Sequence, residues 1–177
     1  MIKIISGGQS GVDRAALDVA RHLFCDYGGW CPRGGLAEDY PSPPGLLEYY
    51  PALHETPTSD YAERTEWNVR DSDATLIIAP HRTAAETGGT GQTQVFAEEH
   101  NKPFFVACLD QNDCYQKARY WLTRQRENTR GRMTLNVAGP RLSKAPDVYR
   151  DATAFLEKLL REACVKQPSL AGTVNGS

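Results

Sequence analysis

The chain has 177 residues, of which 20 are basic and 22 acidic, and its formal net charge is −2. This length suits one domain that buries about 70 % of its unfolded surface, which disfavours repeat arrays and two-domain enzymes. The balanced charge provides no broad positive field for a nucleic acid, and no apolar run is long enough for a membrane helix or a signal peptide. We therefore expect a cytoplasmic protein with no nucleic-acid partner and no membrane partner.

The cysteines and histidines lack the spacings of common metal sites. The five cysteines include no CxxC pair, and the four histidines show no HxxxH or HExxH pattern. An odd number of cysteines without paired spacing is typical of reduced thiols in a reducing compartment. We expect free cysteines and no metal held by protein side chains.

The amino-terminal residues predict a strand, a turn and a helix. The β-branched run Ile2–Ile5 predicts the strand, and residues 6–11 form a glycine-rich turn. From Val12 onward, polar and apolar residues separate onto opposite sides at helical spacing, which predicts an amphipathic helix that ends before residue 27. Trp30–Cys31 is the core of a short second predicted strand.

Residues 32–59 contain six prolines, a density that excludes an ordinary helix interior. Loops of this length inside a domain are usually functional covers or disordered segments. The aromatic residues Tyr40, Tyr49 and Tyr50 favour an ordered cover. We therefore expect this segment to fold over part of the domain.

From residue 60 onward, predicted helices alternate with apolar strands. The predicted order is a helix over 60–70, a strand over 74–79, a glycine turn over 87–91 that opens a helix, a strand over 103–107, a helix over 113–127, a strand over 133–138 and a helix over 147–164. Continuous apolar strands between amphipathic helices indicate a parallel sheet covered on both faces. The prediction is a single-domain α/β fold, a doubly wound, mostly parallel Rossmann-like sheet over residues 1–165, with a disordered tail over 166–177.

Three turns, two of them rich in glycine, meet one edge of this predicted sheet, because right-handed crossovers bring strand-to-helix turns to the edge where ligands of such folds bind. Glycine allows close backbone approach, and the free amides at helix starts attract anions. Hydroxyl, amide and guanidinium groups in the turns add donors suited to phosphate. The candidate binding residues in the three turns are Gly7, Gly8, Gln9, Ser10, Gly11, Gly88, Gly89, Thr90, Gly91, Thr93, Arg141 and Ser143.

Further candidates lie on two of the predicted helices. Asp13 in the first turn of the first helix stabilises the helix dipole, accepts a ligand hydroxyl or binds magnesium through water. Arg64, Thr65 and Asn68 share a helical flank that can face the sheet edge, with surface salt bridging as the alternative for Arg64. Arg14 is expected on a solvated helix face.

Glu38 and Asp39 are neighbouring acids in the proline-rich segment. They could act as general acid or base or bind a sugar hydroxyl, and solvated loop carboxylates are the alternative. The glycine turns match neither GxGxxG nor GxxxxGK[ST], which disfavours a dinucleotide dehydrogenase and a P-loop NTPase.

Several motifs together resemble those of the putative molybdenum carrier family. They are the segments 6–18 (SGGQSGVDRAALD), 29–32 (GWCP), 64–69 (RTEWNV), 72–73 (SD), 88–90 (GGT) and 136–141 (NVAGPR). That family is related, with a circularly permuted motif order, to Rossmann-like nucleotide-sensing proteins and to phosphoribohydrolases once labelled lysine decarboxylases. The resemblance spans residues 1 to about 163. It implies binding of a small phosphorylated ligand, either the molybdenum cofactor (molybdopterin) or a nucleotide, in a homo-oligomer that is a dimer or tetramer.

The resemblance carries the phosphate-facing role to residues 7–11 with Asp13, to 88–93 and to 139–141. Related phosphoribohydrolases have a PGGxGTxxE segment whose glutamate acts on the N-glycosidic bond. Here the matching segment lacks the proline, and Val95 and Phe96 stand where the glutamate is expected. This difference disfavours a hydrolase function. We expect a carrier or sensor of a phosphorylated pterin or nucleotide. The alternatives are an N-glycosidic-bond hydrolase acting on a nucleoside monophosphate or an ADP-ribose-type ligand, or an interaction module whose turns only pack.

Overall fold

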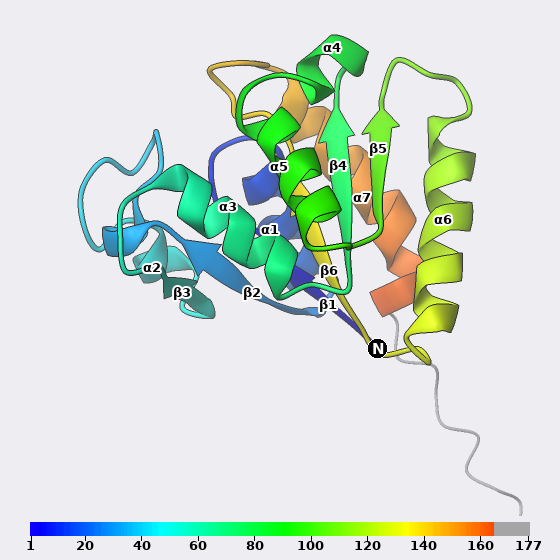
Figure 1. Cartoon of the computed structure of the whole chain (residues 1–177), viewed down its shortest axis with the longest axis horizontal. Coiled ribbons are helices and arrows are strands. Elements are labelled where there is room, and N and C mark those ends of the chain that lie inside the picture. Colours follow the sequence, from blue (N-terminus) through cyan, green and yellow to red (C-terminus); the bar gives the residue numbers. More distant parts are fainter. Residues whose placement is uncertain (165–177) are drawn as a thin grey trace, which may run out of the picture.

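Six parallel strands form one sheet in the order β3-β2-β1-β6-β4-β5 (Figure 1). The computed structural model describes residues 1–164. The strands are β1 (Ile2–Ile5), β2 (Asp26–Cys31), β3 (Leu53–Glu55), β4 (Ala74–Ala79), β5 (Phe104–Cys108) and β6 (Met133–Ala138). Because β2 and β3 extend the sheet on one side of β1 and the other strands extend it on the opposite side, the predicted doubly wound Rossmann-like class is confirmed.

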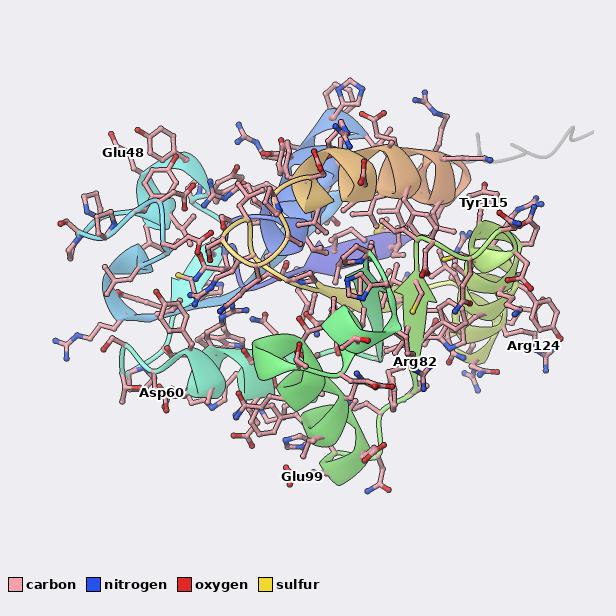
Figure 2. All side chains as sticks on the ribbon, turned by 90° about the horizontal axis from the view of Figure 1, so that it is seen from above. Glu48, Asp60, Arg82, Glu99, Tyr115 and Arg124 are labelled. Carbon is pink, nitrogen blue, oxygen red and sulfur yellow. A yellow bond between two sulfur atoms is a disulfide. The ribbon has the colours of Figure 1, made fainter. Side chains whose placement is uncertain are left out.

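Helices cover both faces of the sheet (Figures 1 and 2). The helices α1 (Val12–His22), α6 (Cys114–Asn128) and α7 (Val148–Cys164) pack on one face, and α3 (Tyr61–Arg70) and α5 (Gly88–Glu99) pack together on the other. Three single-turn elements complete the described chain: η1 (Arg33–Gly35), α2 (Leu46–Tyr49) and α4 (Arg82–Ala85). None of the helices within residues 1–164 has both the length and the apolar character needed to cross a membrane.

Two apolar clusters hold these layers. The larger cluster fills the space between the central strands and the α1, α6 and α7 helices, where Ile4, Leu135 and Leu156 are fully buried. The smaller cluster lies under the proline-rich segment and includes the fully buried Leu17 and Leu46. This second cluster explains why residues 32–59 form an ordered cover, as the aromatic residues of that segment predict.

The register places the carboxyl ends of the central strands at one edge. Ile5 at the end of β1 pairs with Asn136, and Ala138 at the end of β6 pairs with Ile77 of β4. The turns that leave β1, β6 and β4 therefore start at neighbouring points of the same edge. This is the edge at which the sequence predicts a ligand.

The structure extends some predicted elements and adds two that the sequence did not predict. The second strand begins at Asp26 and includes Gly28 and Gly29. Glycine is needed at position 29 (φ 121°) because an added Cβ would lie only 2.5 Å from the carbonyl oxygen of Ser6, the residue that follows β1. The short β3 and α2 elements were missed. The second glycine turn is itself the first turn of α5, since the Gly91 amide already donates a helical hydrogen bond to the Thr87 carbonyl.

The prediction that all cysteines are free is also wrong. Cys25, just before β2, forms a disulfide with Cys164 at the end of α7, and the two Cα atoms are 5.4 Å apart. The partners are separated by 139 positions in the sequence, so no local spacing signals the pair. The predicted domain boundary at residue 165 and the tail over 166–177 lie outside the described residues.

Candidate functional site

The first and third predicted turns are in direct contact. A side chain at Gly11 (φ 83°) would lie 2.4 Å from the Pro140 carbonyl oxygen, and the Val12 amide donates to that oxygen at 3.3 Å. At Gly139, an added Cβ would lie 2.3 Å from the Ile78 carbonyl at the end of β4. These positions require glycine because the backbones of the two turns and of β4 approach too closely for any side chain.

Where the two turns meet, hydrogen-bond donors converge on one carboxylate. The Ser10 hydroxyl donates to Glu38 Oε1, the Ser143 hydroxyl donates to Oε2 at 2.6 Å, and the Ser143 amide donates to Oε1 at 3.2 Å. Arg141 Nε lies 3.4 Å from Oε2. The Leu142 amide donates in turn to Ser10 Oγ at 3.1 Å, which fixes that hydroxyl. Three residues predicted to face phosphate therefore surround a negatively charged group of the chain itself.

These contacts change the acidity of Glu38. Partial burial acts to raise the pKa of the carboxyl, but the hydrogen bonds from Ser10 and Ser143 and the charge of Arg141 outweigh it and lower the pKa below its usual range. Glu38 is therefore an ionised group at neutral pH. It is held as an anion in a polar seat that we call the Glu38 seat, formed by Ser10, Arg141 and Ser143.

The neighbouring acid, Asp39, points to α1. Both of its carboxylate oxygens accept hydrogen bonds from Arg14 at 3.0 Å. The Arg14 guanidinium also lies over the Tyr40 ring, 4.9 Å from its centroid, and its side chain is only 11 % exposed. The prediction that Arg14 lies on a solvated face is wrong, because the proline-rich segment folds onto that face.

One flank of α1 holds the cover in place. Arg14, Asp18 and Arg21 lie at helical spacing, and they bind Asp39, the Tyr50 hydroxyl (2.7 Å) and the Tyr49 carbonyl (3.3 Å) respectively. Beneath the cover, Leu46 packs against Gly8, where an added Cβ would lie 2.8 Å from Leu46 Cδ1.

The glycine turn after β1 is consequently buried along its whole length, with Gln9 6 % and Ser10 2 % exposed. The Gln9 side chain accepts from the amides of Ser10 (3.1 Å) and Glu38 (2.8 Å), so it ties this turn to the cover.

Asp13 and Arg64 form a buried ion pair beside this turn. Arg64 Nη1 donates to Asp13 Oδ2 at 2.9 Å, and the guanidinium lies against Gly7, where an added Cβ would be 1.8 Å from it. Burial raises the pKa of Asp13 although the charge and hydrogen bond of Arg64 and the Gln9 amide act to lower it. The Asp13 carboxylate is thus committed to protein partners, and this arrangement gives no support to a magnesium ligand at that position.

Two other candidates on α3 bind the protein backbone. Asn68 accepts from the Trp30 amide at 2.9 Å and donates to the Trp30 carbonyl at 2.8 Å, which fastens α3 to β2. The Thr65 hydroxyl donates to the Tyr61 carbonyl at 2.8 Å within its own helix. Both side chains therefore make structural contacts, Asn68 with β2 and Thr65 within α3.

The second glycine turn has a more open environment. Gly88 and Gly89 are exposed, and an added Cβ at either would meet nothing within 4 Å. Thr90 and Thr93 are buried, and the Thr93 hydroxyl donates to the Gly89 carbonyl at 2.9 Å. Gly91 approaches the Glu86 carbonyl so closely that its Cβ would lie 2.6 Å away. The glycines of this turn therefore serve two purposes, an open helix start and one tight packing contact.

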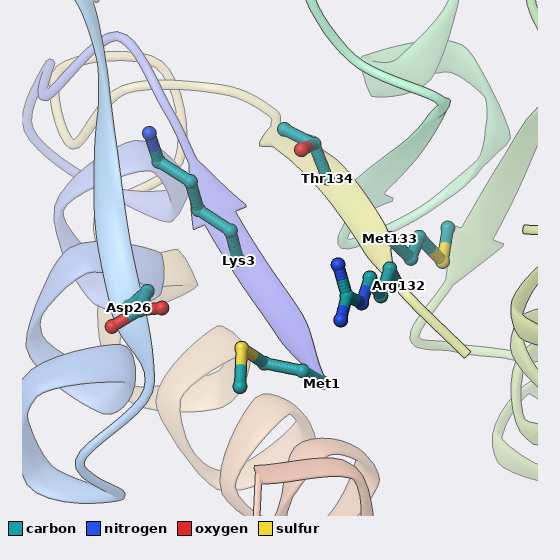
Figure 3. A pocket seen from close by; sticks show the side chains of 6 residues that line it. All are labelled: Met1, Lys3, Asp26, Arg132, Met133 and Thr134. Carbon is teal, nitrogen blue, oxygen red and sulfur yellow. The ribbon is translucent and has the colours of Figure 1, made fainter. Parts of the chain in front are cut away.

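A surface hollow of about 390 Å³ lies at the opposite edge of the sheet, at the amino ends of β1, β2 and β6 (Figure 3). It is lined by Met1, Lys3, Asp26, Arg132, Met133 and Thr134. None of the predicted site residues contributes to it. Because ligands of open parallel sheets bind at the carboxyl ends of the strands, we place the candidate site at the Glu38 seat instead.

No group of three or more histidine, cysteine or acidic side chains within residues 1–164 is arranged to hold a metal ion. Two carboxylates near the seat form ion pairs with arginines: Asp13 with Arg64, and Asp39 with Arg14.

The comparisons with known proteins agree with this architecture. Residues 4–160 match the model of the circularly permutated YpsA SLOG family. The chain belongs to this family. The family model confirms the circularly permuted resemblance read from the sequence motifs.

This SLOG chain is also similar to a protein of known structure. The crystal structure of the putative molybdenum carrier protein from Syntrophus aciditrophicus SB is 44 % identical, with a TM-score of 0.77 over 89 % of this chain and 94 % of that one. No curated protein matches the SLOG chain.

Sequence reasoning missed the role of Glu38 in this SLOG chain. Its carboxylate meets Ser143, which lies 105 positions away, and Ser10, which lies 28 positions away. No motif spacing joins these three residues. The one usable signal is that Glu38 is an acid in a segment predicted to cover the phosphate-facing turns.

Proposed function

We propose that the chain binds a small phosphorylated ligand at the carboxyl edge of the sheet and acts as a carrier or sensor of it. The observation that carries this proposal is the Glu38 seat, in which Ser10, Arg141 and Ser143 direct their donors to a single anionic group. Two hydroxyls, a backbone amide and a guanidinium are the donor set that suits a phosphate group. The start of α1 lies beside the seat and adds its positive dipole end.

The ligand classes that we propose are the molybdenum cofactor (molybdopterin) and a nucleotide. The seat fits the phosphate end of either, since its donors recognise oxyanions and do not read a ring. In the cofactor, molybdenum would be carried on the cofactor's own sulfur atoms and would need no side-chain ligand from this chain. The name of the Syntrophus relative supports the first class.

The hydrolase alternative requires a carboxyl that can exchange a proton with the substrate near neutral pH. The pKa of Glu38 is lowered, and Asp39 is bound through both oxygens by Arg14. No observation on the described residues therefore favours this alternative. Release of a free base from nucleoside monophosphates, lost in Glu38→Ala or Asp39→Ala, is the result that would restore it.

The proposal is tested by calorimetric titration and thermal unfolding with inorganic phosphate and AMP. Ligand at about 100 times its Kd should add roughly 2.7 kcal/mol to the free energy of unfolding. Arg141→Ala and Ser143→Ala should weaken binding, whereas Arg150→Ala, an exposed arginine at the start of α7, should leave it unchanged. Equal binding by the Arg141→Ala protein and the unsubstituted one would refute the site.

The identity of the natural ligand is tested separately. Protein isolated from its own cells should release a phosphorylated compound detectable by mass spectrometry, and metal analysis of the same sample distinguishes molybdopterin from a nucleotide. A homo-oligomer, dimer or tetramer, belongs to the same proposal and is checked by sedimentation of the isolated protein.

A further inference from the structure

Residues 35–45 form a compact loop whose two ends touch. An added Cβ at Gly35 (φ 66°) would lie 2.4 Å from the Pro44 carbonyl, and one at Gly45 (φ 52°) would lie 2.3 Å from the Gly35 carbonyl. Loops with closed ends of this length pack as units and are frequently functional. The positive φ of both glycines allows this close approach of the two ends.

Glu38 and Asp39 lie at the tip of this loop. Ala37 and Tyr40 exchange two backbone hydrogen bonds of 3.0 Å, which forces the two acids between them into a tight turn. Their carboxylates bind at two different places. Asp39 binds Arg14 on α1, and Glu38 enters the Glu38 seat between the turns after β1 and β6.

The seat cannot hold Glu38 and a phosphate at the same time. Each serine hydroxyl has one hydrogen to donate, and in this structure both hydrogens point to Glu38. The Ser143 amide and Arg141 are engaged by the same carboxylate. Two anions on these donors would also repel each other across a partly buried space. A phosphate therefore binds only when Glu38 leaves.

We propose that Glu38 is a built-in competitor that occupies the anion seat when no ligand is bound and is expelled with the 35–45 loop when a phosphorylated ligand enters. This inference rests on the proposed function, because it concerns the regulation of the same seat. Expulsion uncovers Ser10 and the turn beneath it, which are buried while the loop is closed. Asp39 and Arg14 act as the second attachment point of the loop tip.

The competition also sets the ligand charge that the seat prefers. A dianionic phosphate monoester interacts with Arg141 and the serine donors more strongly than the single charge of Glu38, so it displaces the carboxylate more readily than a monoanion does. We therefore expect phosphate monoesters to bind better than phosphate diesters of similar size.

The experiment measures phosphate affinity in Glu38→Ala and Glu38→Gln by calorimetry at pH 7, with inorganic phosphate and AMP as probes. If closed loops make up about 90 % of the unliganded protein, removal of the competitor tightens binding about tenfold. Glu48→Gln is the matched control, since Glu48 is an exposed acid of the same cover and the substitution also removes one charge. It should leave the affinity within twofold.

A second measurement follows the loop itself. Hydrogen exchange at the Ala37 and Tyr40 amides, whose bonds close the tip, should become faster when AMP saturates the unsubstituted protein, and faster without ligand in Glu38→Ala. We expect the Glu38 variants to fold, because the packing of Leu46 and the Asp39–Arg14 pair remain. A cooperative thermal unfolding transition in each variant checks this.

The outcomes separate the inference from the proposed function. If the unsubstituted protein binds AMP and Glu38→Ala binds it no more tightly, the competitor is refuted and the proposed function stands. If neither protein binds phosphate or AMP at any concentration, the proposed function is refuted and the competitor with it. Tighter binding by Glu38→Ala with faster exchange at the tip supports both.

Discussion

Replacement of Arg64 by methionine tests whether the buried pair beside the first turn is held by charge. Asp13 is 2 % exposed, and Arg64 is the cation that binds its carboxylate, at 2.9 Å. Without Arg64, the carboxylate remains buried and ionised or takes up a proton. Removal of one partner from a buried ion pair typically costs about 3–5 kcal/mol.

Protonation of Asp13 limits how much stability the buried charge can cost in Arg64→Met, and it makes this loss depend on pH. The ordinary pKa of an aspartate is about 3.9, so protonating Asp13 at pH 7 takes roughly three pH units at about 1.4 kcal/mol each, which limits the loss to about 4 kcal/mol. At pH 5 the same limit is about 1.5 kcal/mol. The sign follows from a folded pKa that lies above the unfolded value: the folded state binds the extra proton, so the loss shrinks as the pH falls.

Urea unfolding of Arg64→Met at pH 7 and pH 5 checks this reasoning. We expect a loss of about 3–4 kcal/mol at pH 7, a large part of the roughly 5–15 kcal/mol that stabilises a domain, and about 1.5 kcal/mol at pH 5. The double variant Asp13→Asn/Arg64→Met carries no buried charge and should recover most of the loss. A loss below about 1 kcal/mol at pH 7, or a loss that grows at pH 5, would refute the charge-based account.

Three further predictions concern the cover and the disulfide. Leu46→Ala removes a fully buried side chain and should cost about 2–5 kcal/mol in urea unfolding, whereas Leu47→Ala, at a half-buried neighbour, should cost less; equal losses would contradict the packing. Because the pKa of Glu38 is lowered in the folded state, its carboxylate contributes to stability above its unfolded pKa, and this contribution is lost as the pH falls through the folded value. Amide hydrogen exchange in the 35–45 loop should therefore accelerate below about pH 4, and it should not do so in Glu38→Gln. Reduction of the Cys25–Cys164 bond, which closes a 139-position separation, should lower the free energy of unfolding by up to about 5 kcal/mol; full alkylation of all five cysteines without reductant would show that the bond does not form.

The glycine spacing and apolar periodicity of the sequence were sufficient to predict the class of fold. The run Ile2–Ile5 followed by a glycine turn and an amphipathic helix occurs as predicted, and so does the fully buried strand over 74–79. These elements are local, since a strand or helix depends on the periodicity of its own residues. The short β3 strand was missed because three residues are too few to show a period.

The sequence by itself determined that polar turns follow apolar strands, and it predicted an anion site at Ser10, Arg141 and Ser143. Only the tertiary structure decided that Glu38 occupies their donors and that Arg14 is covered by the proline-rich segment. The physical reason is that these contacts join residues 25 to 105 positions apart. Such pairings depend on how the cover closes over the sheet edge, which the packing of Leu46 against Gly8 fixes and no local pattern encodes.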